Sequence, residues 1–175
     1  LTIFFASVAI NAVLGIVALF AGEFGQTQGK ILATSLSISA ASVLSLAMFP
    51  ARERGLLGAV PTIGIAFSIL GFGLLVILVW GDFRSDELGR MVGSVLTFAL
   101  AAGYASLLAL AVIQPKFLNL VRGAYGLLAI ISVMIVGSIW GEPDNENILR
   151  IMGTLSILLT AATITIPVLH RLNRQ

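Results

Sequence analysis

Six long apolar stretches fill almost the whole chain, with only short polar segments between them. They cover residues 1–21, 31–49, 56–80, 91–113, 117–140 and 151–169. Each approaches or exceeds the roughly 20 residues that a helix needs to cross about 30 Å of hydrocarbon. Because lipid offers the backbone no hydrogen bonds, runs of this length are expected to be helical. The sequence therefore predicts an all-α integral membrane protein with six transmembrane helices.

The composition supports the same class. Of the 175 residues, 58% are hydrophobic and 10% are charged, and the mean hydropathy is +1.07. Soluble domains are about 25% charged, so this chain lacks the polar residues that a water-facing surface needs. The net charge is +2, and the ten basic residues are scattered over the helix ends, which argues against nucleic acid as a partner. Cysteine is absent, which excludes a disulfide framework, a thiolate nucleophile and a cysteine metal site.

Charge predicts the orientation of the chain in the membrane. One set of helix connections and ends carries six basic residues and one acid: Arg52, Arg54, Lys116, Arg122, Arg171 and Arg174, with Glu53. The opposite set carries four basic residues and seven acids: Lys30, Arg84, Arg90 and Arg150, with Glu23, Asp82, Asp86, Glu87, Glu142, Asp144 and Glu146. By the positive-inside rule both termini are expected in the cytoplasm, with three acidic loops outside. We expect the membrane to be a bacterial plasma membrane.

A repeat of about sixty residues divides the single domain, residues 1–175, into three helical hairpins at about 1–50, 51–113 and 114–175. In each copy a glycine and an acid are followed by a base, a small residue and a hydroxyl residue. The acid, base and hydroxyl positions are Glu23, Lys30 and Thr34, then Asp82, Arg90 and Ser94, then Glu142, Arg150 and Thr154. The small residues are Ala33, Gly93 and Gly153.

Each repeated position has a physical interpretation. The glycine before the acid is expected to supply a permissive C-terminal cap for the preceding helix. The base starts the next helix, where its charge reaches the headgroups. The small and hydroxyl residues allow close helix contact. Trp80 and Trp140, sixty residues apart, are expected to anchor two helices at the membrane interface. Repetition alone leaves open whether the hairpins close into a threefold bundle or form a row.

Hydroxyl residues are concentrated in the second, fourth and sixth helices and have two interpretations. They are Thr34, Ser35, Ser37, Ser39, Ser42 and Ser45, then Ser94, Thr97 and Ser106, then Thr154, Ser156, Thr160, Thr163 and Thr165. Such side chains either line a polar pathway for a small solute or serve tight helix packing in lipid. In the second helix they point in several directions, which favours packing.

No catalytic or metal-binding pattern stands out, so an enzyme is not expected. None of the six stretches carries a charge near its middle, which argues against an ion-coupled pump. Asn11 and the lone His170 are assigned to helix contact and to a helix end, respectively. Gly64, Gly71 and Gly73 indicate close approach by another helix, a lipid or a pigment. The sequence names no cofactor; a lipid, pigment or quinone in an apolar groove needs no motif.

Together these features predict a non-catalytic membrane protein, an accessory or scaffold subunit of a larger membrane complex. Membrane lipids and other membrane subunits are its expected partners. The alternative is a small-solute transporter or channel with a pathway along the hydroxyl-rich helices.

Overall fold

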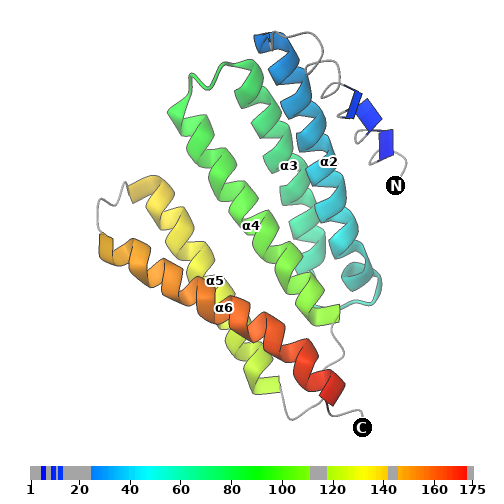
Figure 1. The fold of residues 1–175 in the computed structure, drawn as a ribbon, viewed down its shortest axis with the longest axis vertical. Coiled ribbons are helices and arrows are strands. Elements are labelled where there is room, and N and C mark those ends of the chain that lie inside the picture. The colour runs from blue at the N-terminus through cyan, green and yellow to red at the C-terminus, as the bar shows by residue number, and fades with distance from the viewer. Residues whose placement is uncertain are drawn as a thin grey trace.

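The computed structural model describes Phe5, Ala6, Ala9, Ile10, Ala12 and Val13 and residues 25–110, 118–141 and 146–172. Its helices are α2 (Gln26–Glu53), α3 (Val60–Trp80), α4 (Asp86–Leu110), α5 (Leu118–Gly141) and α6 (Glu146–Leu172), shown in Figure 1. The all-helical expectation is confirmed. Four helices, α2 to α5, are long and apolar enough to cross a membrane; in α6 the apolar segment Asn147–Thr163 is shorter. The expected first helix and Asn11 fall largely or wholly outside the described residues, so the count of six stays a prediction.

Helices α2, α4 and α6 begin about five residues before the apolar stretches that predicted them. In α2 and α4 the added turns start at capped ends. The Gly25 N–H donates to Gln28 Oε1 over 2.9 Å at the start of α2. At the start of α4, the Leu88 N–H donates to Ser85 Oγ over 3.2 Å, and Asp86 and Glu87 occupy the positive end of the helix dipole. Hydropathy marks the apolar span, whereas capping decides where the helix starts.

A tight turn joins α2 to α3, so α3 begins at Val60 rather than at residue 56. The Leu56 N–H donates to the Ala51 carbonyl over 2.9 Å and the Gly55 N–H to the Arg52 carbonyl over 3.0 Å. This is a Schellman end, and Gly55 adopts the left-handed conformation that it requires, with φ 64°. Pro61 follows at the second position of α3, where its missing N–H has no helical partner to lose.

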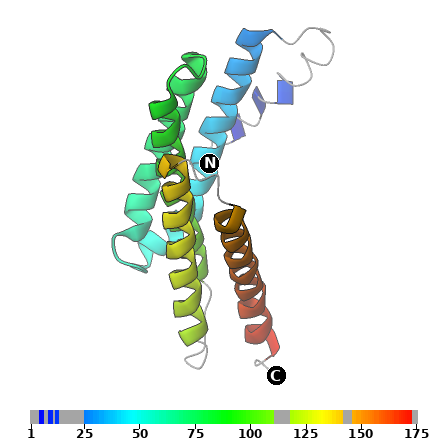
Figure 2. The same cartoon turned by 90° about the vertical axis from the view of Figure 1, so that its left-hand side faces the viewer.

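The helices form two layers. Figure 2 shows α2 and α6 on the same side of the layer formed by α3, α4 and α5. The main contacts join α4 to α2, α3 and α5, join α2 to α3, and join α6 to α5. The described N-terminal residues lie beside α2, at the opposite edge from the start of α6 in Figure 1. Among the described helices, α2, α3 and α4 therefore all contact one another, and α5 and α6 extend the bundle from α4.

Small residues set the closest approach between helices. A Cβ on Gly64 would lie 2.5 Å from both Ala102 Cβ and Met48 Sδ, and one on Gly71 would lie 2.7 Å from Leu96 Cδ2. Gly64 and Gly71 thus let α2 and α4 pack directly against the α3 backbone. A Cβ on Gly73 would meet nothing within 4 Å, so no described helix passes close to it, and contact with a lipid or pigment there stays a prediction.

Candidate functional site

Polar side chains from different helices meet at one end of the bundle, where α3 and α5 end and α2, α4 and α6 begin. We call it the acidic end, after the loops that carry the acids. The first cluster there consists of Lys30 and Thr34 from the start of α2, with Trp80 and Asp82 from the end of α3. The Trp80 indole N–H donates to Thr34 Oγ1 over 3.0 Å, and Lys30 Nζ lies 2.6 Å from Asp82 Oδ1.

Backbone geometry at the end of α3 places Asp82 for this contact. The Phe83 N–H donates to the Leu78 carbonyl over 3.0 Å and the Asp82 N–H to the Val79 carbonyl over 3.3 Å. These are the two hydrogen bonds of a Schellman end. Gly81 is the C-terminal cap of α3, as expected, but its φ of −80° is open to any residue, and the left-handed position falls on Asp82, with φ 57°. The motif starts one residue later, and aspartate tolerates this conformation better than most residues.

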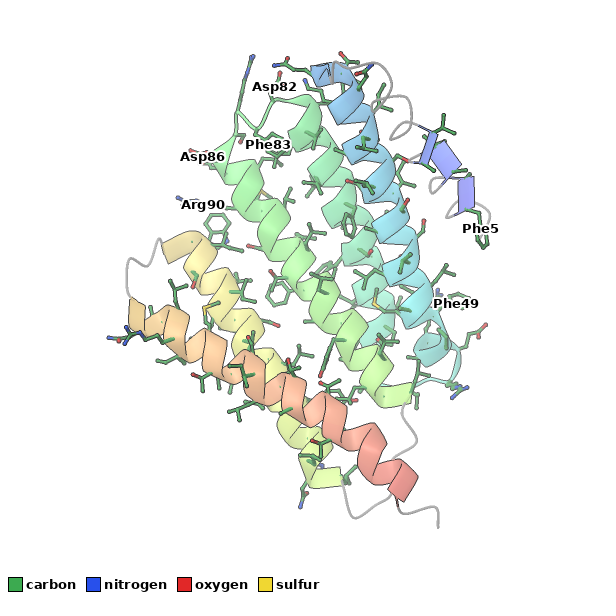
Figure 3. The ribbon with its side chains drawn as sticks, in the orientation of Figure 1. Phe5, Phe49, Asp82, Phe83, Asp86 and Arg90 are labelled. Carbon is green, nitrogen blue, oxygen red and sulfur yellow. The ribbon has the colours of Figure 1, made fainter. Side chains whose placement is uncertain are left out.

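Electrostatics reinforce the first cluster. A hydrogen bond from Lys30 and its positive charge hold the pKa of the Asp82 carboxyl below its ordinary value, with a smaller contribution from Arg84. Arg84 Nη2 lies 3.9 Å from the other carboxylate oxygen. The Lys30 ammonium also lies 5.9 Å from the centroid of the Trp80 ring, within cation–π range. Figure 3 shows Asp82 and Phe83 in the loop between α3 and α4.

A second cluster repeats this geometry sixty residues further along the chain. The Trp140 indole N–H donates to Ser94 Oγ over 2.9 Å, again across 46 residues of sequence. Arg90 stands one turn before Ser94, as Lys30 stands before Thr34. Glu142, the counterpart of Asp82, lies outside the described residues, as does Glu23.

The cavities beside the two clusters are also counterparts. One, of about 580 Å³, is lined by Gln26, Gly29, Lys30, Ala33 and Val79 among others. Its neighbour, of about 540 Å³, is lined by the residues sixty positions later, Asp86, Gly89, Arg90, Gly93 and Ile139. The first cavity has Ala33 and Val79 where the second has Gly93 and Ile139. The smaller residue on α4 is thus matched by a larger residue on α5.

The third set, Arg150 and Thr154, lies on the first turns of α6. Thr154 Oγ1 donates to the Arg150 carbonyl over 2.8 Å, as Thr34 does to Lys30 and Ser94 to Arg90, over 2.8 and 2.9 Å. Thr154 is exposed, and in the described part of the chain both tryptophans donate to other hydroxyls, those of Thr34 and Ser94. Each hydroxyl is thus aligned by its own helix, and its oxygen keeps a lone pair for a donor from a neighbour.

Many hydroxyl groups in the described helices bond within their own helix. Twelve described side chains donate to the carbonyl one turn before their own position: Thr34, Ser37, Ser39, Ser42, Ser94, Thr97, Ser106, Ser132, Thr154, Thr160, Thr163 and Thr165. Ser68 is fully buried and donates to the Ala41 carbonyl of α2 over 3.3 Å. Such bonds satisfy the hydroxyl donors within apolar helices, as serine and threonine do in helices that lie in an apolar environment.

The described side chains at the acidic end supply an ion pair and hydrogen bonds between helices. Within the described ranges no three His, Asp or Glu side chains gather as metal ligands would. Deeper in the bundle, a cavity of about 370 Å³ between α3, α4 and α5 is lined mainly by apolar groups, including Phe67, Phe98 and Ala105. Its shape and lining suit an acyl chain or another apolar molecule. His170 and Pro167 lie in α6, where their side chains are outside the described set.

Sequence reasoning named the members of the clusters but missed how they pair. Lys30 contacts Asp82 of the following copy, 52 residues away, whereas the repeat had aligned it with Glu23 of its own copy. The signal that could have found the pairing is the offset between Trp80 and Thr34, which recurs between Trp140 and Ser94. No protein-family model, no curated protein and no solved structure matches this chain.

Proposed function

We propose that this protein is a non-catalytic integral membrane subunit, an accessory or scaffold component that packs within a larger membrane complex. The proposal includes six transmembrane helices arranged as three tandem hairpins, with cytoplasmic termini and outer acidic loops. The observation that carries it is the pair of indole–hydroxyl hydrogen bonds, Trp80 to Thr34 and Trp140 to Ser94, at equal spacing. The prominent polar contacts between helices serve to join one helix to the next.

Three further features support packing over transport or catalysis. Hydroxyl protons are donated to carbonyls of their own helices, which is how Ser and Thr are accommodated in lipid. The glycines at 64, 71 and 103 let neighbouring helices approach closely, as in membrane helix interfaces generally. Large apolar side chains cover the outside of the described helices, for example Ile69, Val133 and Ile157, each at least 61% exposed. In a membrane this surface faces lipid or other subunits.

Purification from the native membrane in a mild detergent, with mass analysis of all co-purifying proteins, tests the proposal. An accessory subunit is expected to appear at fixed stoichiometry with a defined larger assembly. A lone monomer or homo-oligomer would contradict this role. Flux measured in proteoliposomes provides the complementary test: a saturable or selective leak for an ion or small solute would favour the transporter alternative.

A further inference from the structure

The start of α6 presents a third copy of the surface that binds a helix at the first two clusters. Thr154 is exposed and its hydroxyl donates to its own helix, so the oxygen is oriented to accept a hydrogen bond from outside. A Cβ on Gly153 would meet nothing within 4 Å among the described atoms. At the second cluster, a Cβ on Gly93 would lie 3.1 Å from Ile139 Cδ1 of the docked helix.

The two occupied surfaces define what fits the third. Each receives the end of a helix with a branched apolar residue, a tryptophan and a glycine: Val79 to Gly81 against α2, and Ile139 to Gly141 against α4. In the sequence an acid follows each glycine, Asp82 and Glu142. The branched residue lies near the small residue, and the indole reaches the hydroxyl. We propose that the Gly153–Thr154 surface of α6 docks a transmembrane helix of a partner protein that ends in this same four-residue pattern.

A different protein suits this surface better than a second copy of the chain. The 175 residues contain two tryptophans, and both indoles already donate to hydroxyls of their own chain. Phe20, sixty residues before Trp80, has no N–H to donate. The third surface also departs from the others at one position: Leu149, 62% exposed, stands where the first two have Gly29 and Gly89. Its exposed side chain extends the apolar surface beside Gly153.

The inference rests on the proposed function, because it names the edge through which the subunit joins its complex. A synthetic peptide of residues 60–83, which is α3 with its acidic end, serves as the probe. The peptide carries a donor dye, and the full chain, which has no cysteine of its own, carries an acceptor dye on Arg84→Cys. Energy transfer in proteoliposomes then measures binding of the peptide to the intact protein.

Matched variants locate the binding site. Thr154→Val removes the acceptor, and we expect it to weaken binding about threefold to tenfold, the range for one hydrogen bond between membrane helices. Replacing the tryptophan of the peptide by phenylalanine should weaken binding by the same factor. The two changes together should weaken binding no more than either change alone. Gly153→Leu should block binding sterically. Thr165→Val is the control, because Thr165 is also exposed on α6 and donates to its own helix over 2.7 Å.

Two outcomes would overturn the inference. One is equal binding of the peptide to the wild type, to Thr154→Val and to Gly153→Leu. The other is rapid intramolecular cross-linking between cysteines placed at Phe20 and Thr154, which would assign the surface to the chain's own N-terminal segment. Co-purification of the Gly153→Leu variant from native membranes distinguishes failure of this inference from failure of the proposed function. A partner retained equally by Gly153→Leu leaves the accessory role standing and removes only this docking edge.

Discussion

The indole N–H of Trp80 donates to the hydroxyl of Thr34 over 3.0 Å and ties the end of α3 to the start of α2. Sixty residues later Trp140 and Ser94 make the same contact between α5 and α4 over 2.9 Å. Equal spacing, equal donor and equal acceptor type make these two contacts the clearest structural trace of the proposed repeat. In the proposed repeat they would link consecutive hairpins, because each joins the start of one helix, α2 or α4, to the end of the helix that follows it, α3 or α5.

Removing the acceptor at the first cluster should destabilise the protein measurably. Thr34→Val keeps the shape of the side chain but loses the hydroxyl, so the free energy of unfolding should fall by about 1 kcal/mol. A double-mutant cycle with Trp80→Phe should give a coupling energy of about 0.6 to 1.7 kcal/mol, measured by reversible unfolding in detergent. Thr34→Ser keeps the hydroxyl and is the control. A coupling energy near zero would show that the contact contributes nothing.

The ion pair between Lys30 and Asp82 makes stability depend on pH in one direction. The pKa of Asp82 is lowered in the folded state, so its contribution is present above the unfolded value of about 4 and is lost as pH falls through the folded pKa. Asp82→Asn removes the charge and keeps a residue that tolerates φ 57°. The difference in melting temperature between wild type and Asp82→Asn should therefore shrink below about pH 4. A difference that stays constant from pH 7 to pH 3 would contradict the assignment.

The sixty-residue spacing predicts an ion pair between Arg90 and Glu142, the counterparts of Lys30 and Asp82. Charge reversal tests it. Arg90→Glu and Glu142→Arg should each lower the melting temperature, because each places like charges together at the acidic end. The double reversal should restore most of the loss. Glu87→Arg, on the first turn of the same helix, controls for the change in net charge. Failure of the double variant to recover would count against the pairing.

Alanine substitutions at two glycines of α3, Gly64 and Gly73, should have different effects on stability. A methyl group at Gly64 would overlap Ala102 and Met48, whose side chain is fully buried, so Gly64→Ala should destabilise the protein by about 1 to 3 kcal/mol. Gly73→Ala, in the same helix, meets open space and should be neutral or slightly stabilising, since alanine favours the helix. Thermal unfolding of both variants in one detergent gives the comparison. Equal melting temperatures would contradict the packing of α3 against α2 and α4.

The all-helical class and the members of the clusters could be predicted from sequence, because apolar length and spacing along the chain can be read without knowing which helices are neighbours. What could not be predicted depends on contacts between segments. The pairing of Lys30 with Asp82 requires knowing which helices are neighbours. The left-handed position fell on Asp82 because the hydrogen bonds at the end of α3 start at Leu78. Gly64 and Gly73 look alike in the sequence and differ only in whether a neighbouring helix passes over them.

The orientation proposed from charge can be measured directly, because the chain contains no cysteine that would need to be removed. Arg84→Cys lies in the loop between α3 and α4, and Arg54→Cys lies in the turn between α2 and α3. Both residues are exposed, and Arg84 is 84% exposed in its side chain. With acidic loops outside, a membrane-impermeant thiol reagent added to intact cells should label Arg84→Cys and spare Arg54→Cys. Permeabilised cells should show both labelled, which controls for reactivity. The reverse pattern in intact cells would invert the orientation and move the Thr154 surface to the cytoplasmic side, where a partner helix would have to present its tryptophan end.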